Sequence, residues 1–358
     1  MLKKESLMHK KITATLAAVT LAAGLSACAP TTNSAAPAAG GGSTKSLKDC
    51  TMTMIPKNTD NPFFAAGAYG ADEAATDMGG KKINYTGTAQ PDVPGQIQRI
   101  QSASQQGSCG IAVSGLDPDA LAPALTAAAS RGTKVISYDA DVKKDARTLW
   151  VAPAKDEALG VTQFKLLAEQ MGNKGNYAII SAQSTAAGQN AWIAAAAEEA
   201  KKPEYAGMKL VKTVYGNDVP QTSYDAAISL FQAYPDLDGI LAPTPVSLQA
   251  AVKAKVDQKF NPDLVITGLG WPPSDGALLK SGAVKSFVLW SPRDMGYLSY
   301  HAMEAVLSGK ITGKEGDTFE VGRLGTRTIG ANGEVDTGEP LVFTAENVDS
   351  LLDHFKTQ

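Results

Sequence analysis

The chain has 358 residues, and its 33 Lys and Arg against 36 Asp and Glu give a formal net charge of −3. This balance excludes a broad basic face for nucleic acid. Hydrophobic residues at 44% and charged residues at 19% are ordinary globular usage, enough for about two domains. Three His and three Cys are too few soft ligands for a cluster of zinc or iron-sulfur sites, so metal chemistry would have to rest on carboxylates. We expect no metal site and no cofactor.

Residues 1–27 have the pattern of an export signal. Basic residues from Lys3 to Lys11 precede an uncharged apolar run, Ile12–Leu25, that is too short to span a bilayer. The run ends in Leu25-Ser26-Ala27-Cys28, which resembles the lipobox of bacterial lipoproteins and implies a lipid on Cys28. The alternative is an ordinary secretory signal with a chance cysteine. Both interpretations imply that the protein is exported, and we expect it at the extracytoplasmic face of the cell membrane.

Residues 28–46 are rich in Ala, Pro, Ser, Thr and Gly, the composition of a flexible tether. The other two thiols, Cys50 and Cys109, each precede an apolar strand-like run. In a doubly wound sheet these two strands would be neighbours, and an exported protein meets oxidising conditions. We therefore expect a disulfide between them, with two separate buried thiols as the alternative.

From residue 51 onward, short apolar runs alternate with helical patterns, which indicates βαβ units around parallel sheets. A first series of strands and helices is predicted at residues 51–55, 63–78, 82–85, 97–107, 110–114, 117–132 and 134–138. A second series is predicted at residues 177–181, 189–201, 209–215, 221–234, 239–242, 246–256, 264–269 and 285–290. A late helix at 292–307 and tail segments at 321–324 and 341–343 follow, which we expect to cross between the two series.

The predicted fold class is α/β, with two doubly wound parallel-sheet lobes joined by a hinge. We assign residues 47–152 and about 292–317 to the first lobe, and residues 153–291 and about 318–358 to the second. Ligands of open α/β sheets bind beyond the carboxyl ends of the strands, so two such lobes facing one another make a cleft.

Asp139 follows the strand at 134–138 directly and is the strongest candidate ligand residue. Asp141 is two residues further on, and we expect its side chain and that of Asp139 to point in opposite directions. A carboxylate at a strand end can accept two charge-assisted hydrogen bonds from a polyol. The alternatives are the catalytic acid of a glycosidase, for which no second carboxylate is evident, and a helix cap or surface charge.

Aromatic residues also stand at strand ends and helix starts. Phe63 and Phe64 are adjacent at a helix start, so both cannot enter the same core face, and we expect one to face the cleft. Trp271 and Trp290 follow apolar runs and are open to the same two readings, lobe packing or stacking on a sugar ring. For Trp192, inside its helix, we predict packing.

Polar residues at two predicted helix starts are further candidates for ligand binding. Gln189 and Asn190 offer amide donors and acceptors for hydroxyl groups, although Asn is equally a helix cap. Asp294 either reaches the cleft or stabilises a helix N-terminus. The chain has no nucleotide-binding glycine motif, zinc motif or nucleophile elbow, so we expect a protein that is not an enzyme.

Several motifs together resemble the periplasmic sugar-binding proteins of the ribose-binding type, over essentially all of residues 50–355. They are Asn61-Pro62-Phe63-Phe64, Gly115-Leu116-Asp117-Pro118-Asp119, Val135-Ile136-Ser137-Tyr138-Asp139 and Gln189-Asn190-Ala191-Trp192. Within that family the chain is most similar to rhamnose-binding proteins and autoinducer-2 receptors, through Gly87-Thr88-Ala89-Gln90-Pro91 with Gly95-Gln96, Leu241-Ala242-Pro243-Thr244, and Leu289-Trp290 with Asp294-Met295-Gly296-Tyr297.

The resemblance adds Lys57, Pro243 and Thr244 to the predicted ligand-binding residues. The autoinducer-2 receptors use a Lys, an Asp, an adjacent Asp-Gln pair, and a Pro and an Ala two residues apart; Lys57, Asp139, Gln189 and Pro243 match this pattern. Gly188 stands where the second Asp belongs and Pro245 where the Ala belongs. A lost carboxylate costs about 1.5 to 3 kcal/mol per charged hydrogen bond, which favours a sugar. Further motifs resemble the rhamnose-binding group more closely, and this resemblance implies L-rhamnose or a related deoxysugar: Thr185, Gln189-Asn190-Ala191-Trp192-Ile193, Tyr215-Gly216-Asn217-Asp218 and Thr267-Gly268-Leu269-Gly270.

The implied function is that of a solute-binding lipoprotein of an ABC sugar importer. Two hinged lobes close on one small monosaccharide, using residues from both sides, and a membrane permease recognises the closed form. The expected partners are the sugar, the permease subunits and the membrane through the lipid anchor, with no nucleic acid, and the protein is expected to be a monomer. The alternatives are an autoinducer-2 receptor and an exported glycosidase. A sugar-sensing transcription regulator would need a DNA-binding helix pair where this chain has a signal and tether.

Overall fold

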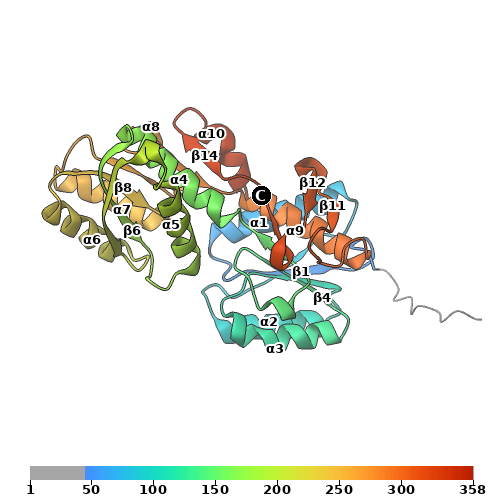
Figure 1. Ribbon diagram of the computed structural model, residues 1–358. Coiled ribbons are helices and arrows are strands. Elements are labelled where there is room, and N and C mark those ends of the chain that lie inside the picture. The colour runs from blue at the N-terminus through green and yellow to red at the C-terminus, as the bar shows by residue number, and fades with distance from the viewer. Residues whose placement is uncertain (1–44, 358) are drawn as a thin grey trace, which may run out of the picture. The chain divides into compact units, whose positions relative to one another are not determined.

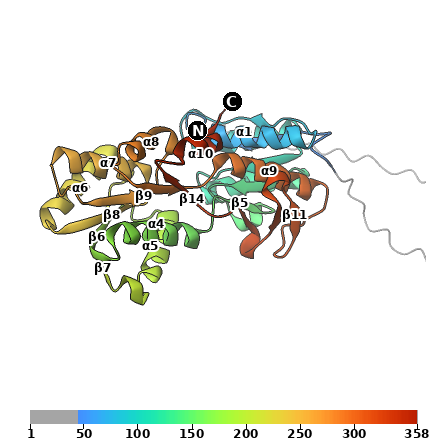
Figure 2. The ribbon, with the colours of Figure 1, turned by 90° about the horizontal axis from the view of Figure 1, so that it is seen from above.

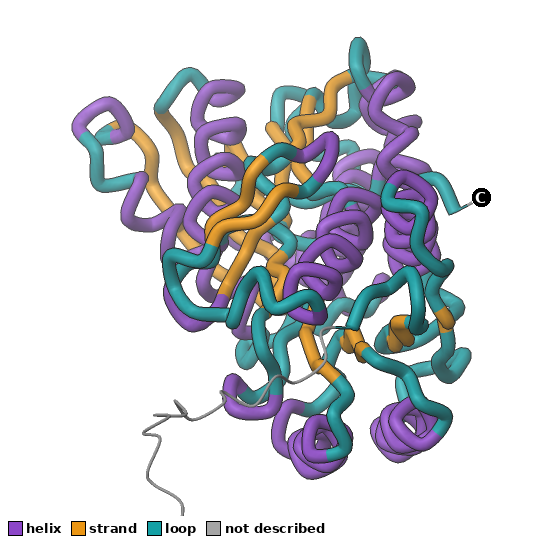
Figure 3. Tube along the Cα trace, turned by 90° about the vertical axis from the view of Figure 1, so that its right-hand side faces the viewer, coloured by secondary structure: helices purple, strands orange, loops and turns teal. Residues whose placement is uncertain are grey.

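Strands and helices alternate along the computed structural model, which describes residues 45–357. The predicted signal peptide, the predicted lipidation site at Cys28 and the predicted tether up to residue 44 lie outside the described residues. Figure 3 shows strands covered by helices on both faces. The predicted α/β class with parallel sheets is confirmed.

The first sheet has six strands in the order β13-β5-β4-β3-β1-β2, all paired in parallel. Its elements up to residue 152 are β1 (Met52–Ile55), α1 (Pro62–Asp77), β2 (Asn84–Tyr85), α2 (Val93–Gln105), β3 (Gly110–Val113), α3 (Pro118–Ser130), β4 (Lys134–Tyr138), η1 (Lys144–Ala146) and β5 (Trp150–Ala152). We call this sheet and the elements packed on it the first lobe.

The second sheet has four parallel strands in the order β7-β6-β8-β9. Its elements and their extension are α4 (Asp156–Met171), β6 (Lys174–Ser181), α5 (Ala187–Glu199), η2 (Pro203–Tyr205), β7 (Gly207–Tyr215), α6 (Pro220–Ala233), β8 (Leu237–Ala242), α7 (Pro245–Asp257), β9 (Val265–Gly268), α8 (Pro272–Lys280) and β10 (Ser286–Leu289). We call this sheet and its packed helices the second lobe.

The C-terminal part of the chain divides between the two cores. Its elements are α9 (Pro292–Leu307), β11 (Thr318–Glu320), η3 (Gly322–Leu324), β12 (Thr326–Thr328), η4 (Ala331–Gly333), β13 (Glu334–Asp336), β14 (Leu341–Thr344), α10 (Val348–Leu351) and η5 (Leu352–Phe355). The prediction placed 318–358 wholly in the second lobe, which is wrong for residues 318–336. Phe319 and Val335 are buried in the first core and β13 pairs with β5, whereas β14 pairs with β10 of the second lobe.

The strands of the first lobe present alternate residues to opposite faces, as their period of two requires. Met54, Ala112 and Ile136 pack with α1 and α9, whereas Ile111 and Val113 pack with α2 and α3. Figure 1 shows these two helix pairs on opposite faces of the sheet. In the second lobe, Phe164 and Leu167 of α4 pack with Ala196 of α5 in one core, whereas α6 and α7 pack in the other, and Figure 2 shows the strands between the two helix pairs.

Four helices begin with the same local signal, a capping side chain followed by proline at the first helical position. Asn61, Asp117, Thr244 and Ser291 each accept a hydrogen bond from a backbone N–H of the first turn. The proline has no N–H to leave unpaired there, and its fixed φ suits a helix. These starts place α1, α3, α7 and α9 directly after the loops that end their preceding strands.

A disulfide joins Cys50 and Cys109. These residues precede β1 and β3, which are parallel neighbours with Met52 opposite Gly110. The bridge therefore closes the amino-end edge of the sheet, opposite the edge where Asp139 stands. Among the described residues, no helix is long and apolar enough to cross a membrane.

Candidate functional site

Three polar side chains meet at the carboxyl-end edge of the first sheet. The side chain of Asp139, 14% exposed after β4, lies with Oδ2 3.3 Å from Nζ of Lys57, which follows β1. Ser114, directly after β3, donates its hydroxyl proton to the same Oδ2 at 2.8 Å. Because β1, β3 and β4 are parallel neighbours, their carboxyl ends lie side by side, and the prediction of Lys57 and Asp139 at one edge agrees with this geometry.

The backbone around Asp139 is shaped to hold its carboxylate there. Asp139 has φ 55°, a left-handed conformation that Asp tolerates better than most residues. Its N–H donates to Val151 at 3.1 Å and its carbonyl accepts from Nε1 of Trp150 at 2.9 Å. Within residues 45–357, Oδ1 has no hydrogen-bond partner, so this oxygen can accept from a ligand.

Asp141 is turned away from this group, as predicted. Its two carboxylate oxygens accept hydrogen bonds from Nε and Nη2 of Arg147, at 2.5 and 2.6 Å. Ser137 also donates to the Oδ1 atom of Asp141. Asp141 therefore forms a structural ion pair with Arg147, which fixes the turn after β4.

The two adjacent phenylalanines separate, as the sequence predicted. Phe64 is 3% exposed and packs edge-to-face with Tyr138, with ring centroids 6.3 Å apart. Phe63 turns the other way, and its ring centroid lies 6.0 Å from that of Trp290 and 6.4 Å from that of Trp271. The prediction of Phe64 as a ligand contact is therefore corrected to core packing, because its ring is enclosed, and Phe63 is the ring that meets the second lobe.

Trp290 carries a buried donor without a partner. It is 8% exposed, and its Nε1 forms no hydrogen bond within the described part of the chain. Its ring centroid is 6.1 Å from that of Trp192, whose own Nε1 donates to Asp156 at 2.7 Å. A buried N–H without a partner is costly, so the indole of Trp290 is a donor that a ligand oxygen would satisfy.

Other predicted residues have local roles in this structure. Thr244 is 1% exposed and caps α7 through Ser247, so its hydroxyl oxygen is already used, and Pro243 beside it is buried. Gln189 and Asn190 are half-buried in the first turn of α5, where the side-chain amide of Asn190 donates to the carbonyl of Ser184 at 2.9 Å. No described contact joins Gln189 or Asn190 to the Lys57–Asp139 pair.

Asp294 is committed to ion pairs rather than free for a ligand. Its carboxylate pairs with Arg323, and Oδ2 lies 3.3 Å from Nδ1 of His354. Burial by itself raises the pKa of Asp294, but the hydrogen bonds from His354 and Arg323 outweigh it and lower the pKa to about 2. The prediction of Asp294 as a ligand contact is therefore replaced by a structural role.

Ser114 and Trp150 are residues of this group that the sequence prediction did not select. The available signal for Ser114 was its place one residue past β3, on the same edge as Asp139. Trp150 carried no such signal, because it belongs to β5, a three-residue strand that was not predicted.

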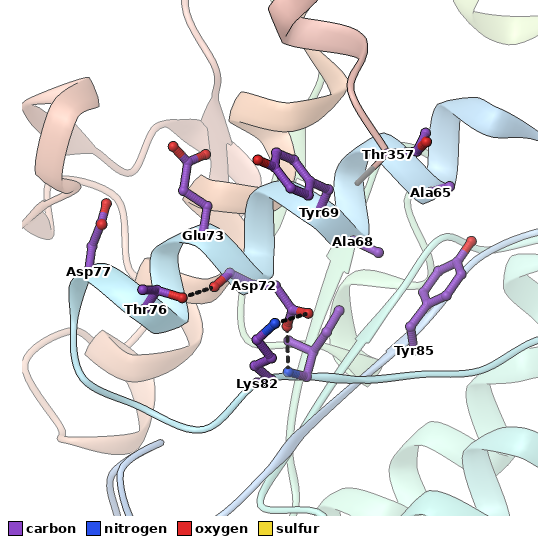
Figure 4. Close-up of a pocket in the computed structure, with 11 residues that line it drawn as sticks. Ala65, Ala68, Tyr69, Asp72, Glu73, Thr76, Asp77, Lys82, Tyr85 and Thr357 are labelled. Carbon is purple, nitrogen blue, oxygen red and sulfur yellow. Dashed lines mark hydrogen bonds and ion pairs between the residues drawn. The ribbon is translucent and has the colours of Figure 1, made fainter.

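A pocket of about 620 Å³ lies along α1, away from these residues (Figure 4). Its carboxylates already have partners: Asp72 accepts from the N–H of Ile83 at 2.9 Å, and Asp77 accepts from the hydroxyl of Tyr297 at 2.9 Å. None of the predicted ligand-binding residues lines this pocket. Within residues 45–357, no group of three or more His, Cys, Asp or Glu is placed to hold a metal ion.

Comparisons with known proteins point to one class. A family model described as a periplasmic binding protein domain matches residues 52–311. The structure of a sugar ABC transporter protein from Actinomyces odontolyticus is 36% identical, with a TM-score of 0.79, and the match covers 85% of this chain and 98% of that one.

Two further matches name a bound or imported sugar. An ABC transporter solute-binding protein from Clostridium phytofermentas, solved with L-rhamnose, is 29% identical with a TM-score of 0.70, covering 84% of this chain and 97% of that one. A D-apiose import binding protein from Actinobacillus succinogenes is 22% identical over 265 residues, 74% of this chain and 84% of that protein.

Proposed function

We propose that this chain, which belongs to the periplasmic binding protein family, is the sugar-binding protein of an ABC importer and binds its sugar at the Lys57–Asp139 pair. Proteins of this family act outside the cytoplasm and deliver a solute without converting it. The observation that carries the proposal is the charge-neutral arrangement of Lys57, Asp139 and Ser114 at the strand ends.

The chemistry of this group suits an uncharged polyol. The ammonium of Lys57 supplies donors, and the free oxygen of Asp139 supplies an acceptor, so a sugar hydroxyl can bond to both. Because the two charges compensate one another, an anionic solute would have to be desolvated with no net opposite charge to balance it. The rings of Phe63, Trp271 and Trp290 offer apolar surface for the carbon face of a sugar.

Our specific proposal for the ligand is L-rhamnose or a related deoxysugar. A deoxysugar has hydrogen in place of one hydroxyl, which in L-rhamnose leaves a methyl group at C6, and the aromatic rings around Phe63 favour that apolar group. The rhamnose-bound neighbour at 29% identity supports this choice.

Autoinducer-2 is the second candidate, because Lys57, Asp139, Gln189 and Pro243 match the receptor pattern. Gly188 argues against autoinducer-2, because it stands where the receptor pattern has its second Asp. A side chain at Gly188 would have space, since the nearest atom to a Cβ there is a ring carbon of Trp192 at 3.6 Å, yet the chain places no carboxylate at this position.

A ligand screen by thermal shift tests the proposal, using the purified mature protein with pentoses, hexoses, deoxyhexoses and autoinducer-2. A ligand at about 100 times its Kd stabilises the protein by about 2.7 kcal/mol, a shift of several degrees. We expect the largest shift with L-rhamnose. A larger shift with autoinducer-2 would replace our ligand, and hydrolysis of a glycoside by the protein would refute the binding function.

The anchor, the permease and the oligomeric state are part of the same proposal. We infer a lipid on Cys28, delivery of the sugar to membrane permease subunits, and a monomer in solution. Mass spectrometry of the mature N-terminus checks the anchor: an acylated Cys28 is expected, and Cys28→Ala should release the protein from the membrane fraction. Light scattering that gives a dimer mass would contradict the monomer.

A further inference from the structure

We propose that Gln96 is a positioning residue for the sugar site, which it orders by joining the loops that carry Lys57 and Ser114. The inference rests on the proposed function at the Lys57–Asp139 pair. Gln96 lies in the first turn of α2 and is 2% exposed. Its side chain is therefore enclosed, and its amide can bond only to protein groups.

The amide of Gln96 makes three hydrogen bonds to two different loops. Its Nε2 donates to the carbonyl of Pro56 at 3.0 Å and to the carbonyl of Ser114 at 2.8 Å. Its Oε1 accepts from the N–H of Leu116 at 3.1 Å. The carboxamide thus uses both of its donor protons and its acceptor on the segments that follow β1 and β3.

These bonds continue the sheet beyond its last backbone pair. The ladder between β1 and β3 ends with the N–H of Ser114 donating to the carbonyl of Ile55 at 3.0 Å. Past that point, Pro56 has no N–H to offer. The carbonyls of Pro56 and Ser114 are therefore joined by the side chain of Gln96, and without it two buried acceptors would lose their partner.

The two tethered loops carry two of the three polar groups of the site. Pro56 is directly before Lys57, and Ser114 itself donates to Oδ2 of Asp139. Gln96 fixes the distance between these loops, and so the positions from which Lys57 and Ser114 approach the Asp139 carboxylate. It does not touch that carboxylate, and it acts on the ligand only through the groups it positions.

The test compares three Gln→Leu variants of the full mature chain. Gln96→Leu removes the three bonds at nearly constant volume. Gln98→Leu changes an exposed residue of the same helix. Gln163→Leu changes a 1% exposed residue of α4, whose Nε2 donates to the carbonyl of Leu159 in its own helix at 3.2 Å and whose Oε1 has no partner within the described residues, and so controls for the loss of a buried amide without a link to the site.

The measurements are the Kd for L-rhamnose by calorimetry and the melting temperature. We expect Gln96→Leu to weaken binding about tenfold or more, and both controls to stay within about twofold, even where Gln163→Leu lowers the melting temperature as much. An unchanged Kd in Gln96→Leu, or an equal loss in Gln163→Leu, would overturn the proposal.

A double-mutant cycle tests whether Gln96 affects sugar binding through Asp139. Combined with Asp139→Asn, Gln96→Leu should cost less than the sum of the two single losses, because both act on one group, whereas Gln163→Leu should add independently. Additive losses for Gln96→Leu with Asp139→Asn would assign it a general structural role instead.

A readout without ligand separates this inference from the proposed function. If the wild-type protein binds no sugar of the screen, the proposed function fails, and positioning is then measured by hydrogen exchange. Gln96→Leu should speed exchange in residues 114–117, including the N–H of Leu116, and Gln163→Leu should not. Equal exchange in wild type and Gln96→Leu would refute the positioning role.

Discussion

Asp139 and Asp141, both just past the end of β4, have different partners. Asp139 pairs with Lys57 and Ser114, whereas Asp141 is held by Arg147. The alternation of side chains along an extended chain predicted this separation from the sequence. It did not predict the left-handed backbone of Asp139, because that conformation comes from contacts with β5.

Exchanging each carboxylate for an amide tests this assignment. Asp139→Asn should weaken sugar binding by about tenfold or more, since a charged acceptor is lost at the site. Asp141→Asn should leave the Kd unchanged but lower the stability, because Arg147, with a side chain 2% exposed, loses its charged partner. Calorimetry and thermal melting of the two variants give the comparison. Equal losses of affinity would refute the prediction that Asp139, and not Asp141, faces the ligand.

The unpaired indole of Trp290 supports a second residue-scale prediction. Trp290→Phe removes the donor and keeps a ring, so affinity for the sugar should fall about threefold to tenfold, the effect of one neutral hydrogen bond. The ligand-free protein loses no hydrogen bond by this change.

Trp192→Phe is the matched control for this prediction. The indole of Trp192 already bonds to Asp156, so this change should reduce stability and spare affinity. Paired Kd and melting measurements decide the point: a Trp290→Phe variant with wild-type affinity would show that the ligand does not use the indole.

At the scale of elements, local signals in the sequence predicted most of the fold. Asn-Pro, Asp-Pro, Thr-Pro and Ser-Pro pairs mark helix starts, and apolar runs mark the strands. Helix α4 was not predicted, because Gly160 and Gln163 interrupt its buried face. Helix α8 was not predicted either, since its buried face includes Asp275, which accepts hydrogen bonds from the N–H of Trp271 and the amide of Gln249.

The α1–α9 pair depends on glycine at the contact. A Cβ on Gly70 would lie 1.9 Å from the carbonyl oxygen of Arg293, and one on Gly296 would lie 1.7 Å from that of Gly67. These are backbone atoms, so the helices themselves would have to separate. Such close packing cannot be read from one sequence, because the partner of a small residue is known only from the structure.

We predict that Gly70→Ala lowers the free energy of unfolding by about 2 kcal/mol or more, through overpacking against the α9 backbone. Gly188→Ala, in α5, should be neutral or slightly stabilising, because a Cβ there meets only a ring carbon at 3.6 Å and alanine favours the helix. Urea unfolding of both variants measures the difference. Similar stabilities would show that α1 and α9 can separate at little cost.

At the scale of the whole described chain, an ion cluster joins segments that are far apart in sequence. Glu73 of α1 pairs with Arg293 of α9 at 2.8 Å, and Arg293 pairs with Asp353 of η5 at 2.6 Å. Asp294 pairs with Arg323 and His354 in the same cluster. The cluster fastens the C-terminal segment, which packs in the second core through Phe355, to helices of the first lobe.

Asp294 should make stability depend on pH through this cluster. Its pKa is lowered to about 2 from the ordinary 3.8, so the folded state favours the ionised carboxylate. The stabilisation is complete above the unfolded pKa, at about pH 5 and higher, and is lost as the pH falls through about 2. A shift of this size corresponds to a contribution on the order of 2 kcal/mol.

We therefore expect Asp294→Asn to be less stable than wild type by about 2 kcal/mol at pH 7, with the difference shrinking toward pH 2. Asp349→Asn is the control, because that side chain is 68% exposed in a surface pair with Lys280 and should change stability by less than about 0.5 kcal/mol at any pH. Urea unfolding at a series of pH values measures both differences. A gap between Asp294→Asn and wild type that stays constant with pH would mean that the carboxylate's charge contributes nothing, and that the loss at pH 7 comes from packing alone.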